Sequence, residues 1–396
     1  MPLNIIVVGA GLGGLGAAIA LNQAGHNVQV LEKSSFLNEV GAAIHVAPNA
    51  TRILKAWGCD LDWLRLVHCE KLQIWNSKGD LVRTPIVTKE YQTALGVHDE
   101  WVLTHRVDLH SALRATAAQV VDGRKIRIEL GARVVSVNAE AGEVLLEDGI
   151  KYTADLIVGA DGIHSRSVHA ITGVDRTSIS TGQNCFRFLV PVSKMQNGAL
   201  TSNLLTKIGP DGVHVFATHD RRLVLYPYGS HDVSWHNAGS VEELLETFEG
   251  FSEELREMCR MAEDVKLWSL ASRDPAPTFV KGKLALIGDA AIRCFLVHQG
   301  QGAAQAFEDA AALAGVLPES TTLEQLPQRL EVYNELRYAH AVMVMMMSRT
   351  ADERREEMLD DLRRFVPGAV SPKCMFGYTW KSDPMREARR VVGGAR

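Results

Sequence analysis

Paired cysteines are absent from this 396-residue sequence. The chain has no C-x-x-C motif and no compact cysteine–histidine pattern, so neither a zinc site nor a disulfide framework is indicated. We therefore expect reduced, mostly buried thiols at the six cysteines, which are Cys59, Cys69, Cys185, Cys259, Cys294 and Cys374.

The sequence also has no excess of basic over acidic residues. The formal net charge is -5 and the pI is about 6.3, which leaves no general positive field for nucleic acid or anionic lipid. We therefore expect no nucleic-acid partner. Hydrophobic residues make up 46% and charged residues 22% of the chain, an ordinary composition for a globular enzyme.

No long uninterrupted apolar run occurs either. The apolar start, residues 3–21, is broken by five glycines and follows no basic segment, unlike a signal peptide or a membrane span. No other stretch approaches the roughly 20 uncharged apolar residues that a spanning helix needs. We expect a cytoplasmic protein without a membrane span.

The same N-terminal stretch contains a strong functional signal. Residues 4–8 form a short apolar run, residues 9–14 a glycine turn, residues 15–24 a helix pattern, and residues 26–31 a second strand. The turn fits G-x-G-x-x-G, and Glu32 follows about 20 residues later, as in dinucleotide-binding βαβ units. A glycine-rich turn without a nucleotide is the weaker alternative.

The chemistry explains the residue types. A pyrophosphate must approach backbone N–H groups at the helix N-terminus, and a Cβ at Gly11 would hold it away. Glu32 would accept hydrogen bonds from the hydroxyls of the adenosine ribose. This unit alone is compatible with NAD as well as with FAD.

Two later strands end in aspartates, and these favour FAD. Residues 156–160 lead into Asp161, and residues 284–288 lead into Asp289. Residues 300–304 then open another helix with a glycine-rich start. Strand-end carboxylates suit the ribitol hydroxyls, and a helix N-terminus suits an electron-rich flavin edge.

The rest of the chain predicts a second body. The pattern predicts strands at 72–76 and 80–83 that form a hairpin joined at 77–79, and alternating apolar residues from 183 to 235 predict mainly antiparallel strands. Beyond residue 282 the pattern is a strand followed by long helices at 300–317 and from 323 to about 347. The methionines of the last helix are expected to lie in its core.

Together and in this order, these segments resemble the aromatic-hydroxylase type of FAD-dependent monooxygenase, close to the salicylate hydroxylase-like group that includes fungal secondary-metabolite enzymes. The resemblance also covers residues 41–49, 105–109, 186–187, 226–227, 268–275 and 377–378. It implies an α/β fold: a glutathione-reductase-like Rossmann FAD-binding domain with an inserted, mainly antiparallel β substrate domain and C-terminal helices. The expected segments are 1–70, 100–178 and 275–365 for the FAD-binding domain, 71–99 and 179–274 for the substrate domain, and 366–396 for a C-terminal tail.

The resemblance further implies a role for individual residues. FAD would be held by the glycine turn and by positions that match the family's motifs, while NADPH or NADH would serve as a transient co-substrate. The expected cofactor-binding residues are Gly9, Gly11, Gly13, Gly14, Glu32 and Lys33 for the ADP moiety, Ala43 in the flavin-adjacent segment, Arg106 and Asp289 for the ribityl and phosphate region, Asp161 where FAD meets the nicotinamide donor, and Gly302 and Ala303 for the flavin pyrimidine.

One loop departs from the family pattern. Family members usually have a histidine after Gly-Asp-Ala-Ala and a proline a few residues later, whereas residues 292–299 contain no proline and one extra residue before Gly300. A loop rebuilt for an unusual substrate, a locally altered gene model and a weakened activity are all compatible with this difference.

The implied chemistry gives three catalytic candidates. Reduced flavin captures O2 as a C4a-hydroperoxide and passes one oxygen to an electron-rich substrate carbon, so the protein must position the substrate and keep the site dry. Arg187, on a predicted strand, would bind a substrate phenolate or carboxylate, although a structural ion pair or an outward-facing position is an equal alternative. Tyr226 would hydrogen-bond a substrate oxygen or else a backbone group, and His45 is either a site residue or an ordinary loop histidine.

The expected partners are a small aromatic or phenolic substrate and O2, with the protein a monomer or homodimer. Two alternatives stay open: a flavin oxidase or dehydrogenase that inserts no oxygen, and a flavin-binding protein of low activity. No metal site is expected.

Overall fold

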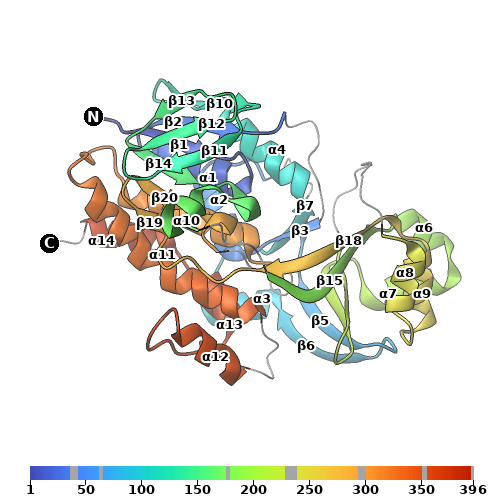
Figure 1. Cartoon of the computed structure of the whole chain (residues 1–396). Coiled ribbons are helices and arrows are strands. Elements are labelled where there is room, and N and C mark those ends of the chain that lie inside the picture. Colours follow the sequence, from blue (N-terminus) through green and yellow to red (C-terminus); the bar gives the residue numbers. More distant parts are fainter. Residues whose placement is uncertain are drawn as a thin grey trace.

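The computed structural model describes residues 1–35, 43–61, 66–174, 179–227, 239–292, 300–349 and 355–393. Figure 1 shows a sheet that contains the N-terminal strand on one side of the molecule and a group of short helices on the other, with long strands between them. The altered loop spans residues 292–299. Its first residue, Ile292, is buried, and residues 293–299 lie outside the described residues.

A six-stranded sheet organises the first body. Its strands, in spatial order, are β10 (Arg127–Leu130), β2 (Asn27–Glu32), β1 (Asn4–Val8), β14 (Leu156–Gly159), β20 (Leu284–Leu286) and β19 (Val280–Lys281). All neighbours pair in parallel except β19, which is antiparallel to β20. Strands from three distant parts of the sequence therefore end at one edge of the sheet, which is where ligands bind in doubly wound folds.

Helices cover this sheet closely. Helix α1 (Leu12–Gln23) packs against α4 (Arg106–Ala117) and α10 (Gly302–Val316) as well as against the sheet. Because α1 has neighbours on several sides, it is buried from Leu12 to Asn22 with few exceptions and needs no polar face. Short β8 (Val120–Val121) and β9 (Arg124–Lys125) form a hairpin after α4.

An antiparallel meander precedes β14. It consists of β11 (Val134–Asn138), β12 (Glu143–Leu146) and β13 (Lys151–Thr153), followed later by the short helix α5 (Ser167–Thr172). Two residues separate β13 from β14. The chain breaks at Asp155, whose carboxylate accepts the Asn4 N–H at 2.8 Å and so starts the pairing of β14 with β1.

The second body combines two sheets with four helices. One sheet has the order β17 (Arg222–Leu225), β16 (Gly212–Ala217), β5 (Lys71–Asn76) and β6 (Leu81–Val87), and the other pairs β15 (Ile179–Leu189) with β18 (Glu263–Ser272). The expected hairpin at 72–83 is therefore confirmed. All these pairs are antiparallel except that of β16 with β5.

The expectation of strands throughout 183–235 is wrong for part of that range. Residues 192–208 form α6 (Val192–Asn197) and α7 (Ala199–Ile208), which pack with α8 (Val241–Thr247) and α9 (Glu253–Arg260). In α7 the buried Thr201, Leu204 and Ile208 follow a three-to-four-residue spacing, which is helical. The prolines and glycines around this segment mark the ends of helices as well as the ends of strands.

A small sheet joins the two bodies. It has the order β3 (Ala43–Val46), β7 (Val102–His105) and β4 (Val67–His68), and it is flanked by α2 (Pro48–Ala56) and α3 (Thr88–Leu95). Its apolar side belongs to a core cluster that includes Trp101, Leu103 and Trp380 together with Val213 of β16. This cluster lies between the first sheet and the β16 sheet.

The C-terminal helices pack onto the first body. They are α11 (Leu326–Arg349), α12 (Arg355–Arg363), α13 (Met375–Trp380) and α14 (Pro384–Gly393). Met343, Met345 and Met346 of α11 are buried, so the prediction that the methionines belong to the core is confirmed for these three. Cys59, Cys69 and Cys259 are buried free thiols, whereas Cys374 is exposed.

Within the described ranges, every helix is too short or too polar to cross a lipid bilayer. The same part of the chain contains no group of three or more acidic, histidine or cysteine side chains that could hold a metal ion.

Candidate cofactor-binding and active site

The glycines between β1 and α1 differ in what surrounds them. Gly9 has φ +100°, and a Cβ there would lie 2.6 Å from the Ala160 carbonyl oxygen. A Cβ on Gly14 would lie 1.9 Å from the Gly9 oxygen, and one on Gly13 would lie 3.0 Å from Ala306 Cβ of α10. These three glycines therefore allow the strand, the turn and two helices to pack closely.

Gly11 alone faces open space. Apart from its own neighbours along the chain, no atom of the described residues lies within 4 Å of a Cβ built there, and its backbone is ordinary, with φ -67° and ψ -178°. Gly11 is the N-cap of α1, and as a glycine it has no side chain to cap the first amides of that helix. Uncapped amides at the positive end of a helix, beside space that a side chain would fill, fit the diphosphate of FAD.

Hydrogen bonds hold both the N–H group and the carbonyl oxygen of Ala10. Glu32 Oε2 accepts the Ala10 N–H at 2.6 Å, while Oε1 accepts the Ser34 N–H at 2.8 Å. His110 Nε2 of α4 donates to the Ala10 oxygen at 2.7 Å. The Glu32 side chain is therefore fixed at the end of β2, beside the turn, and each of its oxygens keeps a lone pair for a sugar hydroxyl. Lys33 is exposed at the next position.

The two predicted aspartates lie at the ends of neighbouring strands. Asp161 follows β14 and Asp289 follows β20, and Gly159 pairs with Leu286 in the register of the sheet. One Asp161 oxygen accepts the Arg166 and Ser167 N–H groups at 2.7 and 3.0 Å, which ties this carboxylate to the start of α5. The other oxygen, Oδ1, is buried and has no hydrogen-bond partner in the described part of the chain.

Asp289 has a different environment. It lies in the 3-10 turn Gly288–Ala290, where its side chain is exposed between two buried neighbours. Asp309 Oδ2 accepts the Gly288 N–H at 2.9 Å, and Arg273 donates to the Ala290 oxygen at 2.9 Å. Asp309 and Arg273 thus anchor the turn on its buried side, and the Asp289 carboxylate points away from the core.

The start of α10 lies against β3. Gly300 has φ +60°, and a Cβ there would lie 2.7 Å from His45 Cβ. Gln301 is the N-cap of α10 and is buried, and its side chain does not cap the first amides of the helix, which include those of Gly302 and Ala303. The predicted flavin-pyrimidine residues are therefore directly beside the strand that carries His45.

Two catalytic candidates come together here. The His45 and Tyr226 rings are 4.6 Å apart in an edge-to-face arrangement, and Trp101 lies 6.0 Å from His45 on another side. The Tyr226 hydroxyl donates to the Ala43 oxygen at 2.9 Å. Burial lowers the pKa of His45 to about 4, so this imidazole is neutral at physiological pH.

Arg106 lies at the other end of the same small sheet. It is the first residue of α4 and directly follows His105, which pairs with Ala43 across β7 and β3. Arg106 is half-buried. The structure therefore places Arg106 and Ala43 at one end of a strand pair.

Arg187 lies on a different pair of strands, β15 and β18. It is exposed on β15, directly opposite the buried Lys266 of β18. Its neighbours Phe186 and Phe188 pack against the core of the helical part of the second body, so Arg187 points to the other face. Among the described residues, Arg187 makes no hydrogen bond or ion pair, and no contact joins it to His45 or Tyr226.

A buried ionic cluster lies behind the turn that carries Asp289, and sequence reasoning missed it. Arg337 of α11 donates to Asp309, Glu308 and Gln305 of α10 at 2.7, 2.7 and 2.8 Å. Burial by itself would raise the pKa of Glu308, but Arg337, His340 and the Asn49 amide lower it to about 2. Burial raises the pKa of Asp309, against the opposing effect of Arg337.

Comparisons with known proteins identify the family and the fold of this chain. A family model described as "FAD binding domain" matches residues 3–348. FAD-dependent monooxygenase cfoG of Aspergillus candidus is 32% identical, over 92% of this chain and 88% of its own length. Hispidin-3-hydroxylase of Neonothopanus nambi is 31% identical, over 91% of this chain and 90% of its own length. A salicylate hydroxylase solved as a substrate complex has a TM-score of 0.73 at 24% identity, covers 99% of this chain and 98% of its own, and so shares the fold.

Proposed function

We propose that this chain inserts one oxygen atom from O2 into a small aromatic or phenolic molecule, with NADH or NADPH as electron donor. The chain belongs to the FAD binding domain family, and its relatives are FAD-dependent monooxygenases. The observation that supports this proposal best is that the nucleotide site adjoins an aromatic wall, which is formed by His45, Tyr226 and Trp101. The glycine turn, Asp289 and the start of α10 lie at one edge of the sheet. His45 lies against the start of α10, and the Tyr226 ring packs against His45.

The chain would hold the cofactor along this edge. Gly11 and the amides of α1 would bind the diphosphate, Glu32 the adenosine ribose and Asp289 the ribityl region. The amides of Gly302 and Ala303 would donate to the flavin pyrimidine. Bound flavin supplies the electron transfer and the oxygen activation, which no side chain can provide.

The aromatic wall would orient the substrate and exclude water. A histidine with a pKa of about 4 is too weak a base to remove a phenol proton to any large extent at pH 7. His45 would therefore act as a neutral hydrogen-bonding group. Tyr226 already donates to Ala43, so its oxygen keeps acceptor capacity for a substrate hydroxyl.

Arg187 is proposed to bind an anionic group of the substrate. Its charge is not used by an ion pair among the described residues, and it lies on the face of β15 away from the helical core. We expect Arg187→Ala to keep bound flavin and to raise KM for an anionic substrate roughly tenfold or more, because a hydrogen bond to a charged group is lost. Stopped-flow reduction by NADPH, with and without substrate, measures the effect.

Arg83→Ala is the matched control, since Arg83 is an exposed strand cation of the same body. Equal kinetics for the two variants would remove Arg187 from the proposed site.

The reaction type is tested by isotope labelling. The purified protein should have a flavin spectrum, and phenols, aromatic acids and indoles are screened for stimulated consumption of NADPH. A stimulating substrate should then give a product whose mass rises by one labelled oxygen under oxygen-18 gas. A product without the label would instead indicate an oxidase or dehydrogenase, and the absence of any stimulating substrate would favour a flavin-binding protein of low turnover.

A further inference from the structure

The segment after α12 is part of the packed core. Trp380, the last residue of α13, is 1% exposed, and its ring lies 5.4 Å from both Trp101 and Tyr91. In Figure 1, α13 lies close to α11. Burial of a tryptophan between two aromatic rings holds the segment firmly in place.

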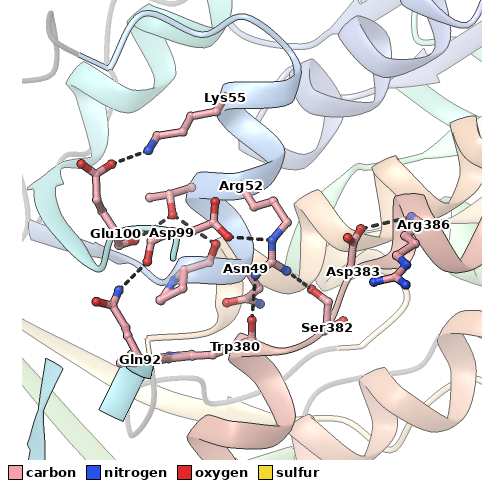
Figure 2. Close-up of polar contacts among 12 residues, drawn as sticks. Asn49, Arg52, Lys55, Gln92, Asp99, Glu100, Trp380, Ser382, Asp383 and Arg386 are labelled. Carbon is pink, nitrogen blue, oxygen red and sulfur yellow. Dashed lines mark hydrogen bonds and ion pairs between the residues drawn. The ribbon is translucent and has the colours of Figure 1, made fainter. Parts of the chain in front are cut away.

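Arg52 of α2 fixes the end of α13. Its guanidinium donates to the Ser382 oxygen at 2.7 Å, to the Trp380 oxygen at 3.2 Å and to Asp99 Oδ2 at 2.8 Å (Figure 2). A cation at the last carbonyls of a helix satisfies acceptors that have no partner within the helix. Because β3 leads directly into α2, this contact connects α13 with the strand that carries His45.

Two chains of contacts lead from α13 to the flavin-facing residues. The first consists of rings: Trp380 contacts Trp101, and Trp101 lies 6.0 Å from His45. It places the C-terminal segment directly behind the aromatic wall.

The second chain of contacts is polar and begins at Tyr378. This ring stacks on His340 of α11 with centroids 4.6 Å apart and an interplanar angle of 15°. His340 Nε2 lies 3.3 Å from Glu308 Oε2, and the other oxygen of Glu308 accepts from Asn49 at 2.6 Å.

Asn49 completes this path to the cofactor edge. Its amide also donates to Gln301 Oε1 at 3.2 Å, and Gln301 is the N-cap directly before Gly302. Asn49, Gln301 and Glu308 are all buried, so a displaced hydrogen bond cannot be replaced readily by water.

We propose that α13 supports the aromatic wall on the side away from the flavin. Tyr378 of this helix is a positioning residue that sets FAD affinity and flavin orientation through His340 and Glu308. The stacked tyrosine holds the imidazole plane against the Glu308 carboxylate, which in turn keeps Asn49 and Gln301 in place at the start of α10. The inference rests on the cofactor placement proposed above. It is tested by FAD binding, so a failure to find oxygen insertion would not affect it.

The test compares FAD dissociation constants and the visible circular dichroism of bound flavin. We expect Tyr378→Leu to weaken FAD binding roughly 2- to 10-fold, the range that one aromatic pair is worth, and to change the visible dichroism. Tyr378→Phe keeps the ring and should restore both values. Lys381→Ala, an exposed change three residues further along, should match the unchanged protein.

A double-mutant cycle with His340→Leu tests the route. If Tyr378 acts through His340, the double variant should bind FAD no more weakly than the weaker single variant. Independent effects that multiply, or a Tyr378→Leu protein with unchanged affinity and dichroism, would overturn the proposal. His340→Leu also provides the test if Tyr378→Leu does not fold: unchanged FAD affinity in that variant overturns the route. Failure of the unchanged protein to bind FAD would identify an error in the cofactor placement itself.

Discussion

Replacing Gly11 with valine is expected to give a folded protein that binds no FAD. Within the part of the chain that the structure describes, no residue beyond the local backbone lies within 4 Å of a Cβ at this position. The backbone conformation is one that any residue adopts, so these residues accommodate the side chain. The same volume is where the diphosphate would contact the amides of α1. Loss of two charge-assisted hydrogen bonds would weaken FAD binding more than about 100-fold.

Two glycine variants separate this effect from a folding defect. Gly14→Val should fail to fold, since its Cβ would lie 1.9 Å from the Gly9 oxygen. Gly393→Val should fold and keep FAD, because Gly393 also has open space but lies at the end of α14, outside the glycine turn. The measurements are the visible spectrum after purification and the melting temperature of the apoprotein. A yellow Gly11→Val protein would show that the diphosphate does not bind at this turn.

The sequence predicted the nucleotide turn because all of its signals are local. A strand, a glycine-rich turn, a helix and Glu32 follow one another within 29 residues, and each has a characteristic pattern. The structure then distinguishes glycines that the motif treats alike: Gly9, Gly13 and Gly14 are needed for packing, whereas Gly11 faces open space. That difference depends on Ala160 and Ala306, which lie far away in the sequence.

Residues that support the site from a distance could not be predicted in this way. His110 contacts Ala10 across 100 residues, and Asn49 contacts Glu308 across 259. His110 belongs to no motif. Asn49 ends one of the segments that resemble the family, but a polar side chain on a helix gives no sign of its partner. Arg337 is a similar case: it lies in a polar stretch of α11 yet is 2% exposed. A charged residue flanked by the buried positions of a long helix is the one signal that could have identified it.

The helices of the second body were missed for a different reason. Residues 192–208 contain one glycine, several polar residues and scattered apolar side chains, so neither helical nor strand spacing dominates over a short window. Packing decides the structure instead: Leu204 and Ile208 of α7 are buried in one cluster with Leu255 and Met258 of α9. Tertiary contacts of this kind override weak local preference.

Replacing Arg337 with leucine is expected to lower the free energy of unfolding by about 3–5 kcal/mol, because it leaves Glu308 and Asp309 buried without their cation. This is a large part of the 5–15 kcal/mol by which proteins of ordinary stability are folded. Urea denaturation measures it. Arg337→Lys should lie between the two, since an ammonium cannot donate to three acceptors in the planar fork of a guanidinium.

Arg133→Leu is the control, because it removes an exposed ion pair with Glu147 and should change stability by less than about 1 kcal/mol. Similar losses for the two leucine variants would contradict the role of the cluster.

The same cluster gives the stability of the protein a defined dependence on pH. The pKa of Glu308 is about 2 in the folded protein, below its ordinary value near 4.5, so its contribution is present above pH 4.5 and is lost as the pH falls toward 2. The raised pKa of Asp309 opposes this trend and makes the loss smaller. In Arg337→Leu the folded carboxylates lose their cation, so their pKa values rise and acidification should stabilise the variant relative to the unchanged protein. Urea midpoints measured from pH 7 to pH 3 should therefore converge, and a constant difference between the two proteins across this range would show that Arg337 does not control the charge of the cluster.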